Sequence, residues 1–181
     1  MNHPFRVLVV VTALSFTAPT FSADAQAGHK EKMVAAWERA KVYTKEYLDA
    51  ATQEVYDFKP TPEMRSFAEQ MHHLAVDNYK IVTEAVNGVM TPSNYKDIEK
   101  TQFKTKAEVT EAVLQSYDFV IAVVKSMDNS RLNDPVKMFN RWETTVEDGL
   151  AKAFEHQTHH RGQTTVYLRL KGTTPPSEKL F

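Results

Sequence analysis

Hydrophobic residues recur every three or four positions along four long segments of this 181-residue chain, and this spacing limits what it can fold into. The clearest series is Val109, Val113, Tyr117, Val120, Val124 and Met127. A helix with about 3.6 residues per turn places such residues on one face, which must then be buried. The sequence shows no strand-like alternation over any useful length, so the pattern predicts an all-α fold.

The boundaries of the first two helices are predicted from proline, glycine and N-cap residues. The first helix is expected over residues 30–52, before a proline-rich turn. The second is expected to begin with Thr61 as N-cap and Pro62 at the first helical position, because proline lacks the N–H that this position leaves unpaired. Gly88 is expected to end it, since glycine adopts the left-handed conformation that closes many helices.

The last two helices each open with a predicted capping box. Thr105 and Glu108 have the required spacing before the third helix, and Thr144 and Glu147 have it before the fourth, which is expected to end at Gly172. Four helices of this length predict a four-helix bundle. The two links are longer than the shortest bundle turns, so the topology need not be a simple up-down-up-down arrangement.

Charge and cysteine content exclude several classes of protein. The 22 basic and 23 acidic residues give a formal net charge of -1 without a cluster of Lys and Arg, which argues against a nucleic-acid partner. The chain has no cysteine, so disulfides, thiolate metal sites, a cysteine nucleophile and a lipoprotein anchor are excluded. A hydrophobic content of 42% is sufficient for one folded domain.

The N-terminal segment has the order of regions that is typical of a secretory signal peptide. Residues 7–18 form a mostly apolar run that is too short to cross a bilayer of about 30 Å, and Ala23 and Ala25 form a cleavage motif. We therefore expect a signal peptide over residues 1–25 and a mature domain over residues 26–181. The mature protein would be exported, to a bacterial periplasm, with no membrane anchor after cleavage.

The histidines carry the strongest chemical signal. His156 and His160 are four residues apart, so both imidazoles can reach one ion from one helix face; unlike in HExxH helices, Gln157 stands where the general base would be. The second helix supplies His72 and His73, and spacing does not choose between them. Three histidines without a fourth protein ligand describe an open metal site. The same pattern is also typical of a partly exposed helix face that binds no metal.

Two segments of this chain carry a resemblance to a known family. One contains His156-x-x-x-His160-Arg161-Gly162-Gln163, Tyr167-Leu168-Arg169-Leu170-x-Gly172 and Pro175-Pro176; the other contains Phe58-Lys59-Pro60-x-Pro62, Met64-Arg65-Ser66-Phe67-Ala68-Glu69 and His73-Leu74-Ala75-x-x-Asn78-Tyr79. Together they resemble the DinB-like superfamily of four-helix metalloproteins. The resemblance implies a bundle with non-sequential helix order, frequent homodimers, and zinc or nickel held by His73, His156 and His160. Some members of this superfamily act with a low-molecular-weight thiol.

Two functions are consistent with such a site. In the first, the protein is an enzyme, a thiol transferase or a hydrolase, whose divalent ion activates a thiol or a water against a small-molecule substrate. Periodicity makes Asp77 and Tyr167 the nearest candidates for a general base, with the substrate in a groove near Tyr167. In the second, the protein is an exported, non-catalytic metal-binding or interaction module. Imidazole ligands suit several transition metals, so the residues alone do not name the ion.

Overall fold

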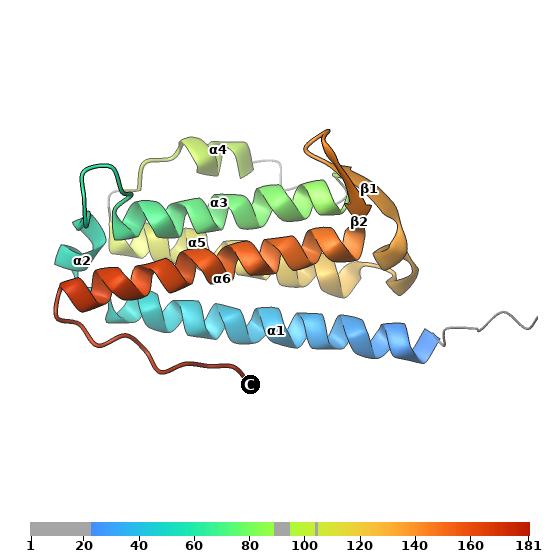
Figure 1. Cartoon of the computed structure of the whole chain (residues 1–181), viewed down its shortest axis with the longest axis horizontal. Helices are drawn as coiled ribbons and strands as arrows, with labels where there is room; N and C mark the ends of the chain where they lie inside the picture. The colour runs from blue at the N-terminus through green and yellow to red at the C-terminus, as the bar shows by residue number, and fades with distance from the viewer. Residues whose placement is uncertain (1–22, 89–94, 104) are drawn as a thin grey trace, which may run out of the picture.

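Four long helices run side by side and form the body of the molecule (Figure 1). The structure, a computed structural model, describes residues 23–88, 95–103 and 105–181. The long helices are α1 (Ala23–Ala50), α3 (Phe67–Ala85), α5 (Lys106–Ser126) and α6 (Val146–Leu170). None of the helices in these ranges combines the length and apolar character that crossing a bilayer requires.

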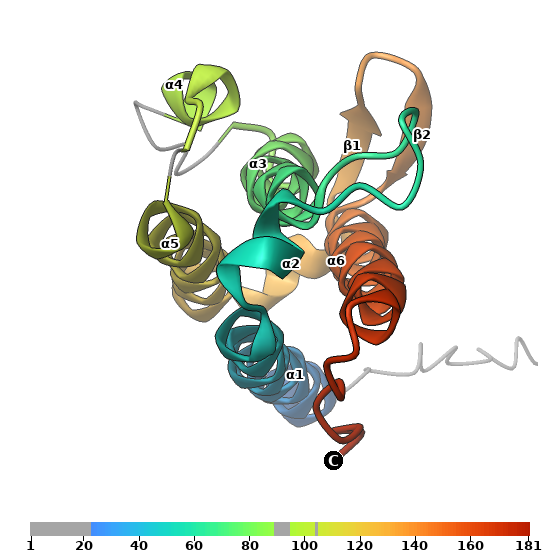
Figure 2. The same ribbon diagram turned by 90° about the vertical axis from the view of Figure 1, so that its left-hand side faces the viewer.

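The helices do not follow one another around the bundle in sequence order. Seen end-on, the order is α1, α5, α3, α6, so α1 and α3 lie on a diagonal (Figure 2). The Lys106 ammonium at the start of α5 donates to the Ala51 carbonyl just after α1, which makes these two helices antiparallel. The Tyr47 and Thr165 hydroxyls lie 2.8 Å apart, and His29 lies 2.9 Å from Glu147, so α1 and α6 are parallel. The predicted four-helix bundle with non-sequential order is therefore confirmed.

The apolar stripe predicted in the third long segment is buried in the core. Its members along α5 are all at most 6% exposed: Val109, Val113, Tyr117, Val120, Val124 and Met127. Opposite them, Trp37 of α1 is fully buried and packs edge-to-face on Tyr117 at 5.7 Å and on Phe154 at 5.3 Å. Each fully buried large side chain contributes about 1.5–3 kcal/mol relative to its exposed state.

The helix starts confirm one sequence prediction and correct three, the first being that of α1, which begins at Ala23 and not at residue 30. The capping box of Thr105 and Glu108 is present at α5. Helix α3 begins after Ser66, not at Thr61 and Pro62, because the turn that the Thr61 carbonyl closes with the Met64 N–H does not continue into a helix. The Ser66 hydroxyl instead accepts from the Glu69 N–H at 3.1 Å, and the Glu69 carboxylate accepts from the Ser66 N–H at 2.6 Å.

The start of α6 differs from its prediction by one residue. The N-cap is Thr145, whose hydroxyl accepts from the Asp148 N–H at 3.2 Å. Thr144, the predicted cap, belongs to a strand, and its hydroxyl donates to the Asp148 carboxylate at 3.1 Å. The helix ends as expected, because Gly172 has a φ of 72° and the Thr173 N–H closes on the Leu168 carbonyl at 2.9 Å.

The links contain elements that the sequence pattern did not predict. They are α2 (Gln53–Asp57), α4 (Tyr95–Lys100), the 3-10 helix η1 (Asn129–Asn133), and the strands β1 (Pro135–Met138) and β2 (Trp142–Thr145). The two strands form a short antiparallel hairpin, an element that the all-α prediction did not include, although the predicted fold class itself is confirmed. The hairpin has too few residues for a clear alternation, and it depends on burying Val136 and Met138 against the bundle.

The turn of this hairpin adopts an unusual backbone conformation. Phe139 and Asn140 have φ values of 52° and 55°, and the Arg141 N–H closes the turn on the Met138 carbonyl at 3.0 Å. Glycine and asparagine adopt this left-handed region readily, whereas a residue such as Phe139 is disfavoured there by about 1–2 kcal/mol. The Glu84 carboxylate accepts from the Phe139 N–H at 2.9 Å and holds the turn against α3.

We expect Gly149→Ala to destabilise the protein, because a Cβ at this position would lie 2.7 Å from the Ala85 Cβ and 2.9 Å from the Met138 sulfur. Overpacking of this kind costs about 1–3 kcal/mol, only partly offset by the better helix propensity of alanine. Thermal unfolding should show a midpoint lower by about 3–8 °C. The control is Gly162→Ala on the same helix, where nothing lies within 4 Å and the midpoint should be unchanged or higher.

Candidate metal centre

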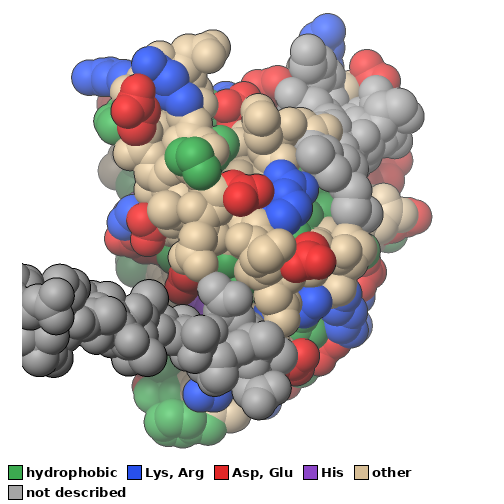
Figure 3. Space-filling model, turned by 90° about the vertical axis from the view of Figure 1, so that its right-hand side faces the viewer, with side chains coloured by type: hydrophobic (Ala, Val, Ile, Leu, Met, Phe, Trp, Pro, Cys, Tyr) green, Lys and Arg blue, Asp and Glu red, His purple; other side chains and the backbone are tan. Residues whose placement is uncertain are grey.

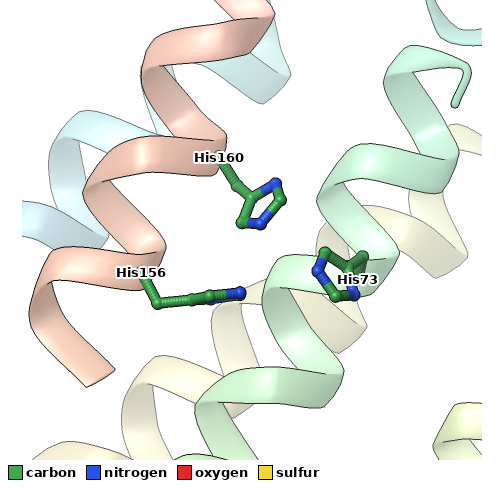
Figure 4. Close-up of side chains that lie close together, drawn as sticks. All are labelled: His73, His156 and His160. Atoms are coloured by element: carbon green, nitrogen blue, oxygen red, sulfur yellow. The ribbon is translucent and has the colours of Figure 1, made fainter. Parts of the chain in front are cut away.

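Three histidines from two neighbouring helices converge at one point (Figure 4). His73 lies on α3, and His156 and His160 lie one turn apart on α6. One nitrogen of each ring lies within 4.8 Å of the others, and the ring centroids are 4.4–5.2 Å apart. Among the residues that the structure describes, these three form the one group of histidine, aspartate or glutamate side chains that could hold a metal ion.

The surroundings of His160 and His73 favour neutral imidazoles. Burial, and then the neighbouring His156 and His73, lower the pKa of His160 to about 3. Burial also lowers the pKa of His73, against an opposing effect from Asp77. A neutral imidazole keeps the lone pair with which it binds a metal ion.

A chain of hydrogen bonds orients His160. Its Nδ1 lies 2.9 Å from the Gln70 side-chain oxygen, and because that oxygen can only accept, Nδ1 carries the proton and Nε2 keeps a lone pair. The Gln70 amide nitrogen in turn donates to the Tyr167 hydroxyl at 3.3 Å, which donates to the Arg65 carbonyl at 2.8 Å. Such outer partners fix the tautomer and ring orientation of a metal-ligating histidine.

Tyr167 therefore does not have the position expected of a general base. Its side chain is fully buried, and its one proton is donated to a backbone carbonyl. The prediction of a substrate groove near Tyr167 is wrong, because the residue faces the core and reaches the triad only through Gln70. Its role is to orient the site.

Asp77, the other candidate, lies directly beside the triad. Its Oδ2 is 3.0 Å from the His156 Nε2 and 3.6 Å from the His73 Nε2. Burial alone would raise the pKa of Asp77, but the hydrogen bond from His156, the electrostatic effect of both histidines and the charge of Lys80 hold it below its ordinary value. The Asp77 side chain is 18% exposed, so an ionised carboxylate lies half-buried beside the two histidines.

The donor set and one unsatisfied atom fit a transition-metal ion. The Nδ1 of His156 is buried and has no hydrogen-bond partner among the described residues. A buried ring nitrogen without a partner is unfavourable unless something else binds it or the ring turns. Three imidazoles with no fourth protein ligand are also the donor set of an open zinc-type site.

The two neighbouring histidines, His72 and His159, have other partners. The His72 Nε2 lies 2.7 Å from the Ile98 carbonyl, and its ring packs edge-to-face on Phe103 at 5.0 Å, so it ties the α4 segment to α3. His159 is exposed and lies 2.8 Å from the Gln163 amide nitrogen. The structure therefore selects His73 over His72 on geometry, a choice that helical spacing alone left open.

Gln157 points away from the triad into the bundle core. Its side-chain oxygen accepts from the Tyr117 hydroxyl and from the Arg161 Nη1, each at 2.8 Å. Arg161 is only 8% exposed, donates also to the Thr44 hydroxyl at 3.3 Å, and lies over the Tyr43 ring at 4.6 Å. Sequence reasoning missed this network; an arginine and a glutamine four apart on an otherwise apolar helix face was the available signal.

Two hollows meet at Asp77. One, of about 610 Å³, extends over His73, Arg65 and Lys80. The other, of about 950 Å³, runs from His156 along α3 and α6 to the hairpin. The face at the hairpin end of the bundle mixes acidic and basic side chains, with no large field of one sign (Figure 3). The triad is therefore reached from outside through spaces of the size that holds a small molecule.

The fold and the triad together define a class: four-helix bundles with non-sequential helix order and three histidines that could hold a metal ion. The chain belongs to the DinB superfamily, whose sequence profile matches residues 36–164. The resemblance drawn from the sequence motifs is thereby confirmed. No curated protein matches this sequence.

Solved structures of this family have the same fold. A DinB-like protein of Bacillus subtilis, YjoA, is 18% identical with a TM-score of 0.63, and the match covers 83% of this chain and 96% of that one. YfiT of Bacillus subtilis, described as a probable metal-dependent hydrolase with an unusual four-helix bundle topology, is 14% identical with a TM-score of 0.62 and coverages of 86% and 92%. At such identities the likeness establishes the fold alone.

Proposed function

We propose that this protein is a divalent-metal-dependent enzyme of the hydrolase type, with His73, His156 and His160 as the metal ligands. The observation that carries the proposal is the three-histidine group with an ionised carboxylate, Asp77, beside it at the junction of two hollows. The description of YfiT as a probable metal-dependent hydrolase supports the same reaction class. Zinc and nickel are the ions we expect, because both accept imidazole nitrogen ligands.

A divalent ion held by His73, His156 and His160 would supply Lewis-acid chemistry and would promote ionisation of a water or thiol near neutral pH. The chain's own residues supply the rest. Asp77 is an ionised acceptor at the edge of the triad and takes up the proton of the attacking group, while Gln70 keeps His160 in one tautomer. If the attacking group is a thiol, the same arrangement makes the protein a transferase.

Asp77→Asn should lower kcat/KM by about 10²–10⁴-fold with metal still bound, because asparagine cannot accept a proton in this role. We would measure turnover of 4-nitrophenyl acetate, for hydrolysis, and of 1-chloro-2,4-dinitrobenzene with 2-mercaptoethanol, for thiol transfer. The control is Asp118→Asn, an exposed carboxylate that pairs with Lys41 on a distant face. Unchanged turnover in Asp77→Asn would remove Asp77 from the reaction.

Cobalt-substituted protein separates an enzyme from the alternative of a non-catalytic metal-binding module. We expect azide and 2-mercaptoethanol each to change its visible spectrum between pH 6 and 9, because three protein ligands leave room for an exogenous one. A spectrum that neither ligand changes, together with no turnover, would support the module for metal storage, sensing or stability.

We also propose that the protein is exported to a bacterial periplasm. The predicted signal peptide lies mostly outside the described residues, and its cleavage site after Ala25 lies in the first turn of α1. We expect the exported protein to begin near Gln26, which intact-mass spectrometry of protein from the periplasm would show. A retained segment 1–25 would contradict this prediction.

A further inference from the structure

The larger of the two hollows is a groove that connects the triad to the hairpin. Its volume is about 950 Å³, and it lies between α3 and α6. The triad end is formed by Asp77 and His156, and the far end by residues of the hairpin. Eight residues of α6, from Asp148 to His156, separate the two ends, which corresponds to about 12 Å along the helix axis.

Two exposed aromatic side chains line the hairpin end. Trp142 is 55% exposed and Phe139 is 37% exposed, and their rings pack edge-to-face with centroids 6.2 Å apart. Met138 and Ile81 continue the apolar wall toward the triad. Exposed aromatic surface that lines a concavity is typical of a ligand site, whereas isolated exposed apolar residues need no explanation.

Phe139 is placed there against the preference of the backbone. Its φ of 52° is in the left-handed region, where glycine or asparagine would suit the turn better. Burial of the Phe139 ring in the core does not offset this strain, because the ring remains exposed to the groove. Strain of this kind persists where a side chain serves a purpose other than stability.

Lys80 is the charged group of the groove that forms no close ion pair among the described residues. It is exposed and lines both hollows, and its charge acts on the Asp77 carboxylate one turn earlier on α3. Every other charged side chain of the groove is engaged: Asp77 with His156, Glu143 with Lys137, Asp148 with Thr144, and Glu155 with Lys152. Lys80 is therefore the basic group next to the triad that is available to an anionic ligand.

From this arrangement we propose the substrate class of the site, an inference that rests on the proposed function. The substrate is a small organic anion whose carboxylate or similar group pairs with Lys80, close to the bond that reacts. Its other end carries an aromatic group that packs on Trp142 and Phe139. Lys80 follows Asp77 by three residues of α3, a rise of about 4.5 Å, and the aromatic side chains lie farther along the groove.

Binding of 4-phenylbutyrate to the full chain, with and without zinc, tests this proposal by isothermal titration. Two comparators each remove one feature: 4-phenylbutan-1-ol lacks the charge, and hexanoate lacks the ring. We expect 4-phenylbutyrate to bind at least about tenfold more tightly than either, a difference typical of one charged or aromatic contact. Equal affinities of the three compounds would overturn the proposal.

Three variants test which residues contact the charged and the aromatic parts of the ligand. Lys80→Gln should remove the preference for the acid over the alcohol, and Trp142→Ala should weaken the acid about tenfold. Phe139→Asn should weaken it similarly while the unfolding midpoint stays the same or rises, because asparagine suits the turn. Lys41→Gln, which pairs with Asp118 away from the groove, and Leu170→Ala, an exposed residue far from the groove, serve as controls with unchanged affinity. Full affinity in Lys80→Gln and Trp142→Ala would place the ligand elsewhere.

The binding and turnover experiments distinguish a failure of the proposed substrate class from a failure of the proposed enzyme function. Selective binding of 4-phenylbutyrate by the metal-free protein, without turnover in the assays above, would support the groove and reject the enzyme. Turnover that depends on Asp77, without selective binding, would support the enzyme and reject the substrate class. Trp142 also reports binding by its fluorescence, because the other tryptophan, Trp37, is fully buried in the core.

Discussion

His160→Ala is expected to abolish metal binding, with a loss of affinity of about 100-fold or more. The variant removes the most buried of the three histidines and leaves two imidazoles, too few to hold a divalent ion in an open site. Elemental analysis of the purified protein and titration of the apoprotein with zinc would measure the loss. Because a ligand stabilises the state that binds it, zinc should raise the unfolding midpoint of the parent protein and leave that of the variant unchanged.

The other histidines of the two helices provide matched controls. His159→Ala changes the residue next to His160, but its ring is exposed and pairs with Gln163, so metal binding should remain. His72→Ala should retain the metal for a similar reason, because that ring binds the Ile98 carbonyl. Loss of the metal in His72→Ala with retention in His73→Ala would show that the register of α3 assigned to the site is wrong.

Gln157→Leu is expected to lower the free energy of unfolding by about 3 kcal/mol. The substitution keeps the size of a fully buried side chain but removes the oxygen that accepts from both Tyr117 and Arg161. The guanidinium would stay buried with one weaker acceptor, Thr44, and leaving a buried charge unsatisfied is among the largest single-residue penalties. For a chain of this length, the unfolding midpoint should fall by about 6–12 °C.

Gln115→Leu is the matched control for this prediction. Gln115 lies on the exposed face of α5, where its amide reaches only Glu111 one turn earlier. Its replacement should change stability by no more than about 0.5 kcal/mol. A Gln157→Leu variant that is as stable as this control would mean that the network contributes no net stability. Such an outcome is known for buried polar groups that are replaced by apolar side chains of the same shape.

Parts of the fold could be predicted from the sequence because single helices obey local rules. The stripe on α5 and the capping box at Thr105 depend only on residues close in sequence, and both predictions are confirmed. The α3 start was misplaced because Thr61-Pro62 and Ser66-Glu69 both carry N-terminal signals, and only the second continues into helix. The hairpin could not be predicted, since its strands are stabilised by packing of Val136 and Met138 on the bundle.

The candidate site was predictable to the extent that it lies on one helix. Spacing alone placed His156 and His160 on one face, but it could not choose His73, because that choice depends on how α3 packs on α6. Asp77 was named by periodicity, and the structure places it beside two of the histidines. Tyr167 was named by the same rule and is buried behind the site, because residues two turns apart on a helix share a face but can differ in depth.

The diagonal placement of α1 and α3 has a consequence for how the chain folds. In a bundle of successive helical hairpins, each new helix docks on its predecessor, and most contacts are local in sequence. Here α3 docks on α6, and the Gln70–His160 contact that supports the site joins residues 90 positions apart. Closing so long a loop is entropically unfavourable, and folding slows as the mean sequence separation of contacts grows. We therefore expect slower refolding than in a simple up-down bundle of equal length, with the histidines assembling only once α6 has docked.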